Sequence, residues 1–311
     1  MYLFSNIIGV FIFDGQFNIV DEIFFNSLED CKNKGQFIKE LKNKYKNLKE
    51  PEQEALKKIL PYFKNKKFFR SFYNKNLQLT KLSVKNSVTD DVLIVQAIKS
   101  IEETDKAISL LVKRLREWYG IYNPEFTMSM ENNEKFACEI LDKEKMELLE
   151  KLKVNINESI GAELKQEDIE PIKSLAQQIH SLYKLRKSQD GYISAMMDEL
   201  CPNMKAVCGG MLGAKLIEHA GSLKKLSKMP ASTIQILGAE NALFRHMRTG
   251  AKPPRHGIIA NHPLIAKAPD KMRGRIARAL ADKISIAVKI DYFNGEFIGD
   301  KLRKKLEEKF G

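Results

Sequence analysis

Hydrophobic positions in the first third of the chain predict a small α/β domain. Residues 2–13 are rich in β-branched and aromatic side chains, and residues 17–23 repeat this character, which predicts the two strands of a hairpin. Asp14-Gly15 between them is a short turn signal, because glycine adopts positive φ without steric cost. A Lys-rich stretch with helical spacing follows, interrupted by prolines. We therefore expect an N-terminal α/β domain over residues 1–90.

A heptad repeat of apolar side chains begins after this domain. The apolar positions alternate steps of four and three residues over more than three heptads, with one polar interruption at Asp105. The members of the repeat are Ile94, Ile98, Ile101, Ile108, Val112, Leu115 and Tyr119. This pattern is typical of a helix that pairs with another helix in a coiled coil.

Two further helices are predicted in the middle of the chain, so residues 91–200 are expected to form a helical coiled-coil region. One helix covers residues 134–152, and the other begins at Asp168, a good N-cap residue, and continues to Leu200. The second would be roughly 50 Å long at a rise of about 1.5 Å per residue. Its apolar stripe is expected to form a dimerisation seam made of Ile172, Leu175, Ile179 and Leu182. An ordinary helical bundle inside one domain is the alternative.

The last third of the chain, residues 201–311, has shorter helical patterns separated by glycine and proline. Residues 271–290 are strongly amphipathic, with apolar side chains on one face and arginines elsewhere. The predicted fold class is therefore α+β: a small N-terminal α/β domain, a long helical coiled-coil arm and an all-α C-terminal domain.

Charge separates this last third from the rest. The net charge is +12, and residues 1–201 contain 31 basic and 31 acidic side chains, whereas residues 202–311 contain 21 basic and 9 acidic ones. Because the whole excess lies in one part of the chain, it indicates a polyanionic partner for that part rather than a general solubility device.

The sequence contains no recognisable pattern of a catalytic, metal-binding or cofactor-binding site. The cysteines and histidines show neither zinc-site spacing nor an H-E-x-x-H motif, and no serine nucleophile elbow is present. Residues 210–215 superficially look like a phosphate-binding loop, but Lys215 is followed by Leu216 instead of Ser or Thr, and helix packing is the better interpretation. No apolar run is long enough for a membrane span, and the N-terminus lacks a basic leader. We expect an intracellular, non-membrane protein.

One segment, residues 238–257, combines positive charge with rigid turns. No acidic residue occurs between Asn241 and Pro269, and the interval contains three histidines together with five basic side chains. On a helix, Asn241, Arg245 and Arg248 share one face, which suits contacts to phosphate, sugar or base edges. Leu243 and Phe244 are expected to anchor the other side in the core. Pro253-Pro254 is expected to hold the following loop extended. A solvated basic helix face is the alternative.

Residues 238–259, GAENALFRHMRTGAKPPRHGII, closely resemble the signature of the Nop domain. The resemblance extends to residues 94–120, 170–197 and 272–287, so it covers most of the chain from 90 to 290. Its members most similar to this chain are the archaeal Nop-family core scaffold proteins of box C/D ribonucleoproteins. Their eukaryotic relatives are nucleolar and splicing proteins.

The resemblance implies a non-catalytic scaffold for guide-directed RNA 2′-O-ribose methylation. Its implied partners are a fibrillarin-type methyltransferase held by the N-terminal domain, a second copy paired through the coiled coil, a box C/D guide RNA with a kink-turn, and the ribosomal-type protein bound to that kink-turn. No cofactor is implied for the chain itself. The implied RNA and protein contacts are Gly238, Ala239, Glu240, Asn241, Arg245, His246, Arg248, Lys252, Arg255 and His256.

Two positions depart from the family pattern, which usually has lysine where this chain has Asn241 and Arg255. The first change removes a charge and the second keeps it. Three alternatives remain: an RNA-processing enzyme, a splicing-type Nop-domain RNA binder, and a purely structural coiled-coil dimer with an incidental basic end. The expected location is the cytoplasm of an archaeal cell, since no targeting signal is recognised.

Overall fold

The computed structural model describes residues 1–310, and Gly311, the last residue of the predicted C-terminal domain, lies outside the described residues. The contacts divide the chain into two compact units, with the boundary between Thr89 and Asp90. The first unit contains a three-stranded sheet with helices, and the described part of the second is built from helices and loops. The predicted α+β fold class is confirmed. The finer division into residues 91–200 and 201–311 stays a prediction.

The sheet of the first unit is an antiparallel meander. Its strands are β1 (Tyr2–Ser5), β2 (Gly9–Phe13) and β3 (Ile19–Phe24). The single strand predicted over residues 2–13 is wrong, because a turn at Asn6 divides it. The Asn6 side-chain oxygen accepts hydrogen bonds from the backbone N–H groups of Ile8 and Gly9, at 2.9 and 3.3 Å. Such local side-chain bonds offer the backbone an alternative to strand pairing.

The turn between β2 and β3 lies at the Asp14-Gly15 signal, but its physical basis differs from the prediction. The positive φ, 67°, falls on Phe17 and not on Gly15. The Asp14 carboxylate accepts hydrogen bonds from the backbone N–H groups of Gln16 and Asn18, each at 2.8 Å. An Asx-type turn therefore closes this loop.

Helices cover both faces of the sheet, so β2 is buried along its whole length. Ile12 packs with Leu41 on one face, and Phe11 packs with Ile59 and Phe68 on the other. The helical segments of this unit are α1 (Leu28–Lys32), α2 (Lys34–Lys44), α3 (Gln53–Ile59), η1 (Leu60–Lys64) and α4 (Lys66–Asn86).

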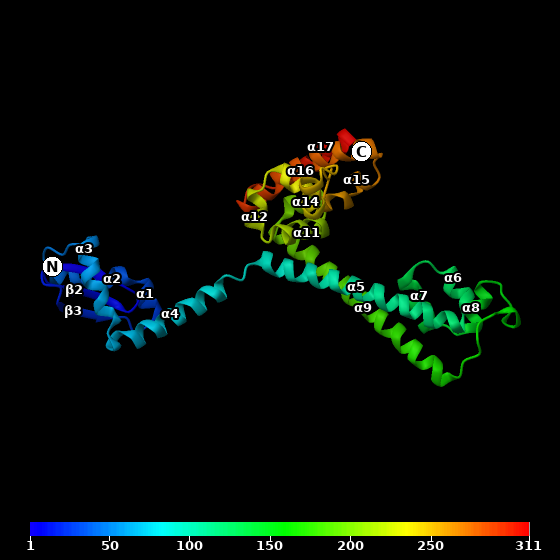
Figure 1. The fold of residues 1–311 in the computed structure, drawn as a ribbon, viewed down its shortest axis with the longest axis horizontal. Helices are drawn as coiled ribbons and strands as arrows, with labels where there is room; N and C mark the ends of the chain where they lie inside the picture. Colours follow the sequence, from blue (N-terminus) through cyan, green and yellow to red (C-terminus); the bar gives the residue numbers. More distant parts are fainter. Residues whose placement is uncertain (311) are drawn as a thin grey trace. The chain divides into compact units, whose positions relative to one another are not determined.

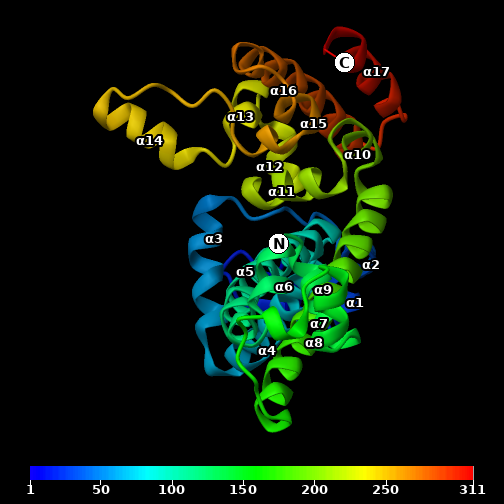
Figure 2. The same ribbon diagram turned by 90° about the vertical axis from the view of Figure 1, so that its right-hand side faces the viewer.

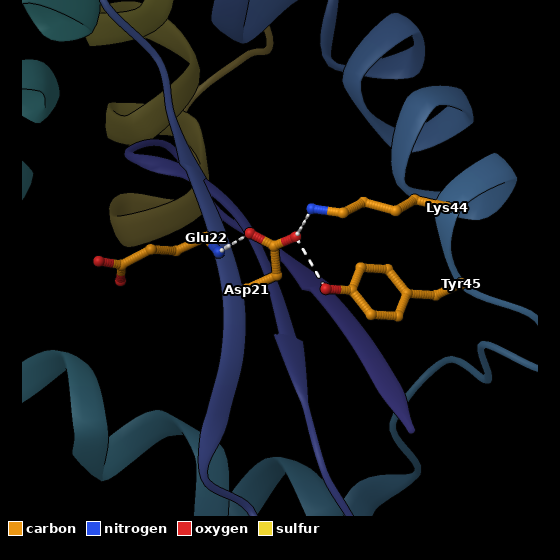
Figure 3. A network of polar contacts seen from close by, with 4 residues as sticks. All are labelled: Asp21, Glu22, Lys44 and Tyr45. Atoms are coloured by element: carbon orange, nitrogen blue, oxygen red, sulfur yellow. Dashed lines mark hydrogen bonds and ion pairs between the residues drawn. The ribbon is translucent and has the colours of Figure 1, made fainter.

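Asp21 of β3 joins the sheet to the end of α2 (Figure 3). Its carboxylate accepts hydrogen bonds from Lys44 Nζ at 2.8 Å and from the Tyr45 hydroxyl at 3.0 Å. The hydrogen bond from Lys44 lowers the pKa of Asp21 below its ordinary value of 3.8. Because the folded-state pKa is depressed, this contribution to stability is present above the unfolded-state pKa and is lost as the pH falls through the folded-state pKa. Solvent screening keeps the contribution small.

The second unit begins with two long helices that lie side by side (Figure 1). They are α5 (Asp90–Tyr122) and α9 (Gln166–Leu200). Arg186 pairs with Asp105 at 3.0 Å, and the Gln189 amide donates to the Ser100 hydroxyl at 2.7 Å. Later residues of α9 thus face earlier residues of α5, so the pair is antiparallel. The predicted heptad seam of α5 is buried, but Thr104, not Asp105, occupies its polar position. Asp105 lies at the edge of the seam, where it can pair with Arg186.

Short helices pack at the end of this pair where α5 finishes and α9 begins. They are α6 (Pro124–Ser129), α7 (Asn133–Asp142), α8 (Lys145–Lys151) and η2 (Ile156–Glu158). The single helix predicted over residues 134–152 is wrong, because the backbone is extended at Lys143 and Glu144. The predicted N-cap is also wrong, since Lys165 caps α9 and Asp168 lies in its first turn. A carboxylate there still interacts favourably with the helix dipole.

The predicted dimerisation seam lies inside this helix pair. Ile172 and Ile179 are fully buried in a cluster with side chains of α5 and α7, and Leu175 and Leu182 pack against the same cluster. Because this chain already covers Ile172 and Ile179, neither side chain is free to contact a second copy. Their assignment as intermolecular contacts is therefore corrected, whereas dimerisation through other residues stays a prediction.

Except for α14, the remaining helices pack into a bundle with α16, as Figure 2 shows. Helix α16 corresponds to the amphipathic helix predicted over residues 271–290. Gly213, in the false phosphate-loop motif, lies on a buried helix face against Met197 and Met204, as the helix-packing interpretation predicts. The helical segments are α10 (Pro202–Cys208), α11 (Gly210–Ala220), α12 (Leu223–Lys228), α13 (Ala231–Ile236), α14 (Glu240–Thr249), η3 (Ile258–Asn261), α15 (Pro263–Ala266), α16 (Asp270–Tyr292) and α17 (Gly299–Phe310).

A buried carboxylate ties this bundle together. Asp291, near the end of α16, accepts hydrogen bonds from the backbone N–H groups of Asn203 and Met204 at 3.1 and 2.8 Å, and from the Asn203 amide at 2.8 Å. The Asn203 side-chain oxygen accepts from the backbone N–H of Ile298 at 2.7 Å, just before α17. Three helices are thus joined through two polar side chains.

We predict that Asp291→Ala destabilises the second unit by about 3 kcal/mol, because it leaves three buried N–H donors without an acceptor. Denaturant unfolding followed by circular dichroism measures this change. Asp282→Ala on the same helix is the matched control, since the Asp282 side chain is exposed and, among residues 1–310, forms an ion pair only with Lys283. Equal stability of the two variants would contradict the role of Asp291.

Candidate nucleic-acid interface

The predicted basic segment forms an excursion from the bundle that leaves after α13 and returns at η3. Its two ends are joined by hydrogen bonds. The backbone N–H of Gly257 donates to the Gln235 carbonyl at 2.8 Å, and that of Ile258 donates to the Leu237 carbonyl at 2.9 Å. The Gln235 amide also donates to the Arg255 carbonyl at 2.7 Å. The base of the excursion is therefore fixed to the bundle.

Glycines allow the chain to make this close approach. A Cβ atom on Gly257 would lie 2.7 Å from the Ile236 carbonyl carbon and would overlap the Leu237 carbonyl oxygen. Gly238 has φ +83°, a left-handed conformation that favours glycine, and a Cβ there would overlap the Ile258 side chain. Both glycines are required by local geometry, independently of any ligand.

Helix α14 projects from the bundle, as Figure 2 shows. None of its residues is buried, so the prediction that Leu243 and Phe244 anchor it in the core is wrong. Phe244 is 56% exposed and Met247 is 71% exposed. With half-buried Leu243 they form an apolar face on one side of the helix. The sequence pattern alone could not reveal this, because an amphipathic pattern does not show whether the apolar face is covered.

The neighbouring side of α14 carries the predicted polar residues, since Phe244 comes three residues after Asn241 and four before Arg248. Asn241, Arg245 and Arg248 are all exposed, and their spacing puts them on one face of the observed helix. Neither arginine makes an ion pair with any residue from 1 to 310. The helix therefore presents two free cations beside an apolar surface.

Some of the other predicted site residues hold the local structure, and others are exposed on the surface. Ala239 is the N-cap of α14, and the Glu240 carboxylate accepts a hydrogen bond from the Gly238 backbone N–H at 2.8 Å, which commits this carboxylate to a local turn. His246 is half-buried and its Nδ1 contacts the Ala251 carbonyl oxygen. Lys252 is exposed on the return loop.

Arg255 and His256 lie at the end of the return loop, and the surroundings of Arg255 were missed by sequence reasoning. Its guanidinium lies 3.3 Å from the carboxylate of Asp270, the first residue of α16. The acid-free interval ends at Pro269, one residue before this carboxylate, so counting charges along the sequence overlooked it. His256 is half-buried. Arg255 must therefore give up its ion pair with Asp270 before it binds an anion.

His262, one of the three histidines in the acid-free interval, does not act as a cation. Burial lowers the pKa of His262, and its Nδ1 accepts a hydrogen bond from the Leu264 backbone N–H at 3.3 Å. An imidazole with a lowered pKa is neutral at pH 7, so His262 acts as a helix cap.

The cysteines and metal-ligating side chains of residues 1–310 show no reactive thiol and no metal site. Burial raises the pKa of Cys208 to about 12, and burial also raises the pKa of Cys138, whose sulfur lies 3.1 Å from His180 Nδ1. Both thiols therefore stay protonated at neutral pH. Within residues 1–310, His, Cys, Asp and Glu form no group suited to holding a metal ion. The helices of this same range also lack the length and apolar character needed to cross a bilayer.

Comparison with known proteins gives a family match and several relatives. A family model described as "Nop: snoRNA binding domain, fibrillarin" matches residues 100–311. The chain is 42% identical over 268 residues to an uncharacterized NOP5 family protein of Methanocaldococcus jannaschii, covering 81% of this chain and 64% of that protein. It is 40% identical over 215 residues to Nucleolar protein 58 of Neosartorya fischeri, covering 65% of this chain and 36% of that protein. The matched parts thus span less than two thirds of these relatives' own length.

A solved structure is similar over nearly the whole length of the chain. Superposition on a chain from the crystal structure of a fibrillarin/Nop5p complex gives a TM-score of 0.47 at 24% identity, covering 99% of this chain and 98% of that chain.

We predict that Gly257→Ala destabilises the second unit by more than about 2 kcal/mol, because the new methyl group would overlap fixed backbone atoms. Thermal unfolding measures the loss. Gly274→Ala is the control, since its nearest neighbour would be Arg255 at 3.9 Å, an ordinary contact. If Gly257→Ala unfolds at the same temperature as the control, the excursion is not fixed as described.

Proposed function

Because this chain belongs to the Nop family, as its signature segment predicted, we propose that it is a scaffold of a box C/D ribonucleoprotein that binds its partners without catalysing a reaction. One observation carries the proposal: the family signature forms an exposed helix, α14, that has a cationic face and an apolar face. A surface with both properties is suited to a composite target of RNA and protein.

The cationic face is the proposed RNA contact. Arg245 and Arg248 are exposed and unpaired within residues 1–310, so they bind phosphate without first breaking an ion pair. Lys252 adds a further charge on the return loop, and Arg255 contributes once it exchanges the Asp270 carboxylate for phosphate. Phosphate contacts of this kind fix position and orientation on the RNA. Asn241 supplies an uncharged hydrogen-bonding group at the N-terminal end of this face.

The apolar face is the proposed contact for the ribosomal-type protein that binds the kink-turn. Phe244 and Met247 expose large apolar surfaces, which in water favour association with another apolar surface. Because the two faces lie on one narrow helix, a partner on the apolar face and RNA on the cationic face would be neighbours. The proposal is therefore a composite site that recognises the RNA together with its bound protein.

The N-terminal unit is the proposed binding site for a fibrillarin-type methyltransferase, which would perform the 2′-O-ribose methylation. The family description names fibrillarin, but its match covers residues 100–311, so the support from this unit itself is its exposed aromatic side chains, which suit a protein partner. Phe69 and Tyr73 of α4 are 62% and 58% exposed, and their rings stack with centroids 6.4 Å apart. A second copy of the chain, paired through the helical arm, completes the proposed assembly.

We predict that Arg245→Ala/Arg248→Ala weakens binding to kink-turn RNA and lowers the salt dependence of binding. Each lost phosphate contact should reduce the slope of log K against log[salt] by about 0.7–0.9. Fluorescence anisotropy over a series of salt concentrations measures both quantities. The matched control is Arg245→Lys/Arg248→Lys, which keeps both charges and should retain the slope. An unchanged slope in the alanine variant would refute the proposed RNA contact.

We predict a different result for Phe244→Ser/Met247→Ser. The variant should bind kink-turn RNA alone as the original chain does, but should lose at least about tenfold in affinity for the RNA with its kink-turn protein bound, because apolar contact area is lost. Met128→Ser, at a side chain 87% exposed on α6, is the control. Equal affinity of both variants for the RNA–protein complex would show that the apolar face is not a contact.

A further inference from the structure

A second basic surface lies away from α14, in a groove between α13, α16 and α17. The groove has a volume of about 670 Å³, within the range of typical ligand sites. Five basic side chains line its two walls. Lys283 pairs with Asp282, and the other four are Arg275 and Arg278 on α16 and Lys305 and Lys309 on α17. All four are exposed, and none forms an ion pair with any residue from 1 to 310.

The groove contains almost no compensating negative charge. Its one acidic lining residue, Asp282, is paired with Lys283 at 3.0 Å. Cations that converge on a concave surface repel one another, and the field they create is relieved by binding an anion. The charge distribution therefore predicts an anionic occupant.

The remaining lining residues describe this occupant further. Between the two charged walls the groove is lined by the apolar side chains of Ala279, Leu306 and Phe310. A single-stranded nucleic acid matches both features, because its phosphates meet the cations while an unstacked base packs on the apolar surface. A duplex has its bases stacked inside and matches the charge alone.

The groove is also continuous with the candidate interface. Gln235 lines it, and the same residue holds the return loop through the Arg255 carbonyl and the Gly257 N–H. Gly274, one residue before Arg275, lies against the side chain of Arg255. A strand bound near Arg255 therefore has a direct path along α16 into the groove.

We propose that the groove between α13, α16 and α17 binds a single-stranded RNA segment that continues from the α14 site. The inference rests on the proposed RNA-binding function and adds a second, separate contact to it. Phosphates lie on Arg275, Arg278, Lys305 and Lys309, and a base lies against the half-buried side chains of Ala279 and Phe310.

The test uses the full chain and a fluorescein-labelled oligouridylate of about ten nucleotides, a length typical of single-strand sites. Lys305→Gln/Lys309→Gln should weaken binding about tenfold and lower the salt slope by about 1.4, the value for two phosphate contacts of a single strand. The matched control, Lys301→Gln/Lys304→Gln, removes two exposed charges from the same helix outside the groove and should change affinity less than about twofold. Arg278→Gln, on the opposite wall, should also weaken binding.

Two results would overturn the inference. The first is equal weakening by the groove variant and its control, which would show an effect of net charge alone. The second is displacement of the oligonucleotide by a polyglutamate peptide of equal charge at equal concentration, which would identify the groove as a site for an acidic protein segment.

Kink-turn RNA without single-stranded flanks separates this inference from the proposed function. If Arg245→Ala/Arg248→Ala weakens binding of that RNA while the groove variant leaves oligouridylate binding unchanged, the groove inference alone fails. The reverse pattern overturns the α14 assignment alone.

Discussion

The C-terminal bundle depends on a carboxylate that is almost removed from water. Asp291 is 7% exposed, and burial raises the pKa of this carboxyl even though three N–H donors lower it. A buried carboxylate is costly unless hydrogen bonds replace its hydration. Here the hydrogen bonds come from the start of α10, and the Asn203 side chain also accepts a hydrogen bond from the backbone at the start of α17. The arrangement of three helices is thus specified by directional bonds as well as by apolar packing.

Helix α16 links the buried Asp291 to the basic residues on the surface. Asp291 fixes its last turn, and its buried face fills the centre of the bundle. Its first turn carries Asp270 beside Arg255, and its next turns carry Arg275 and Arg278 in the groove. One helix therefore determines where both basic surfaces lie, and the groove's second wall depends on the same anchor, because α17 starts next to Asn203.

Local patterns predicted what depends on local physics. The heptad from Ile94 to Tyr119 was recognised because burial on one helix face imposes its period. The pattern could not distinguish Asp105 from Thr104 at the polar position, since that choice depends on Arg186 in another helix. The strand break at Asn6 depends on a side-chain bond that has no periodic signature.

The candidate site shows the same limit. Its helix, its exposed arginines and its glycines follow from residues 238–257. The exposure of Phe244 depends on what the rest of the chain leaves uncovered, and the pairing of Arg255 depends on a residue just outside the interval. The groove joins residues 231–235 with residues 275–310, so only the tertiary structure brings its charges together.

The closed base of the α14 excursion has a consequence for how such a chain can change. The excursion leaves the bundle and returns to within a hydrogen bond of its departure point, and its helix contributes no buried residue. Closing a loop of fixed ends costs little more when the loop becomes somewhat longer or shorter. The excursion therefore behaves as a cassette: its length and side chains can be exchanged for those of a relative while the bundle keeps its fold, and target preference can diverge without a new core.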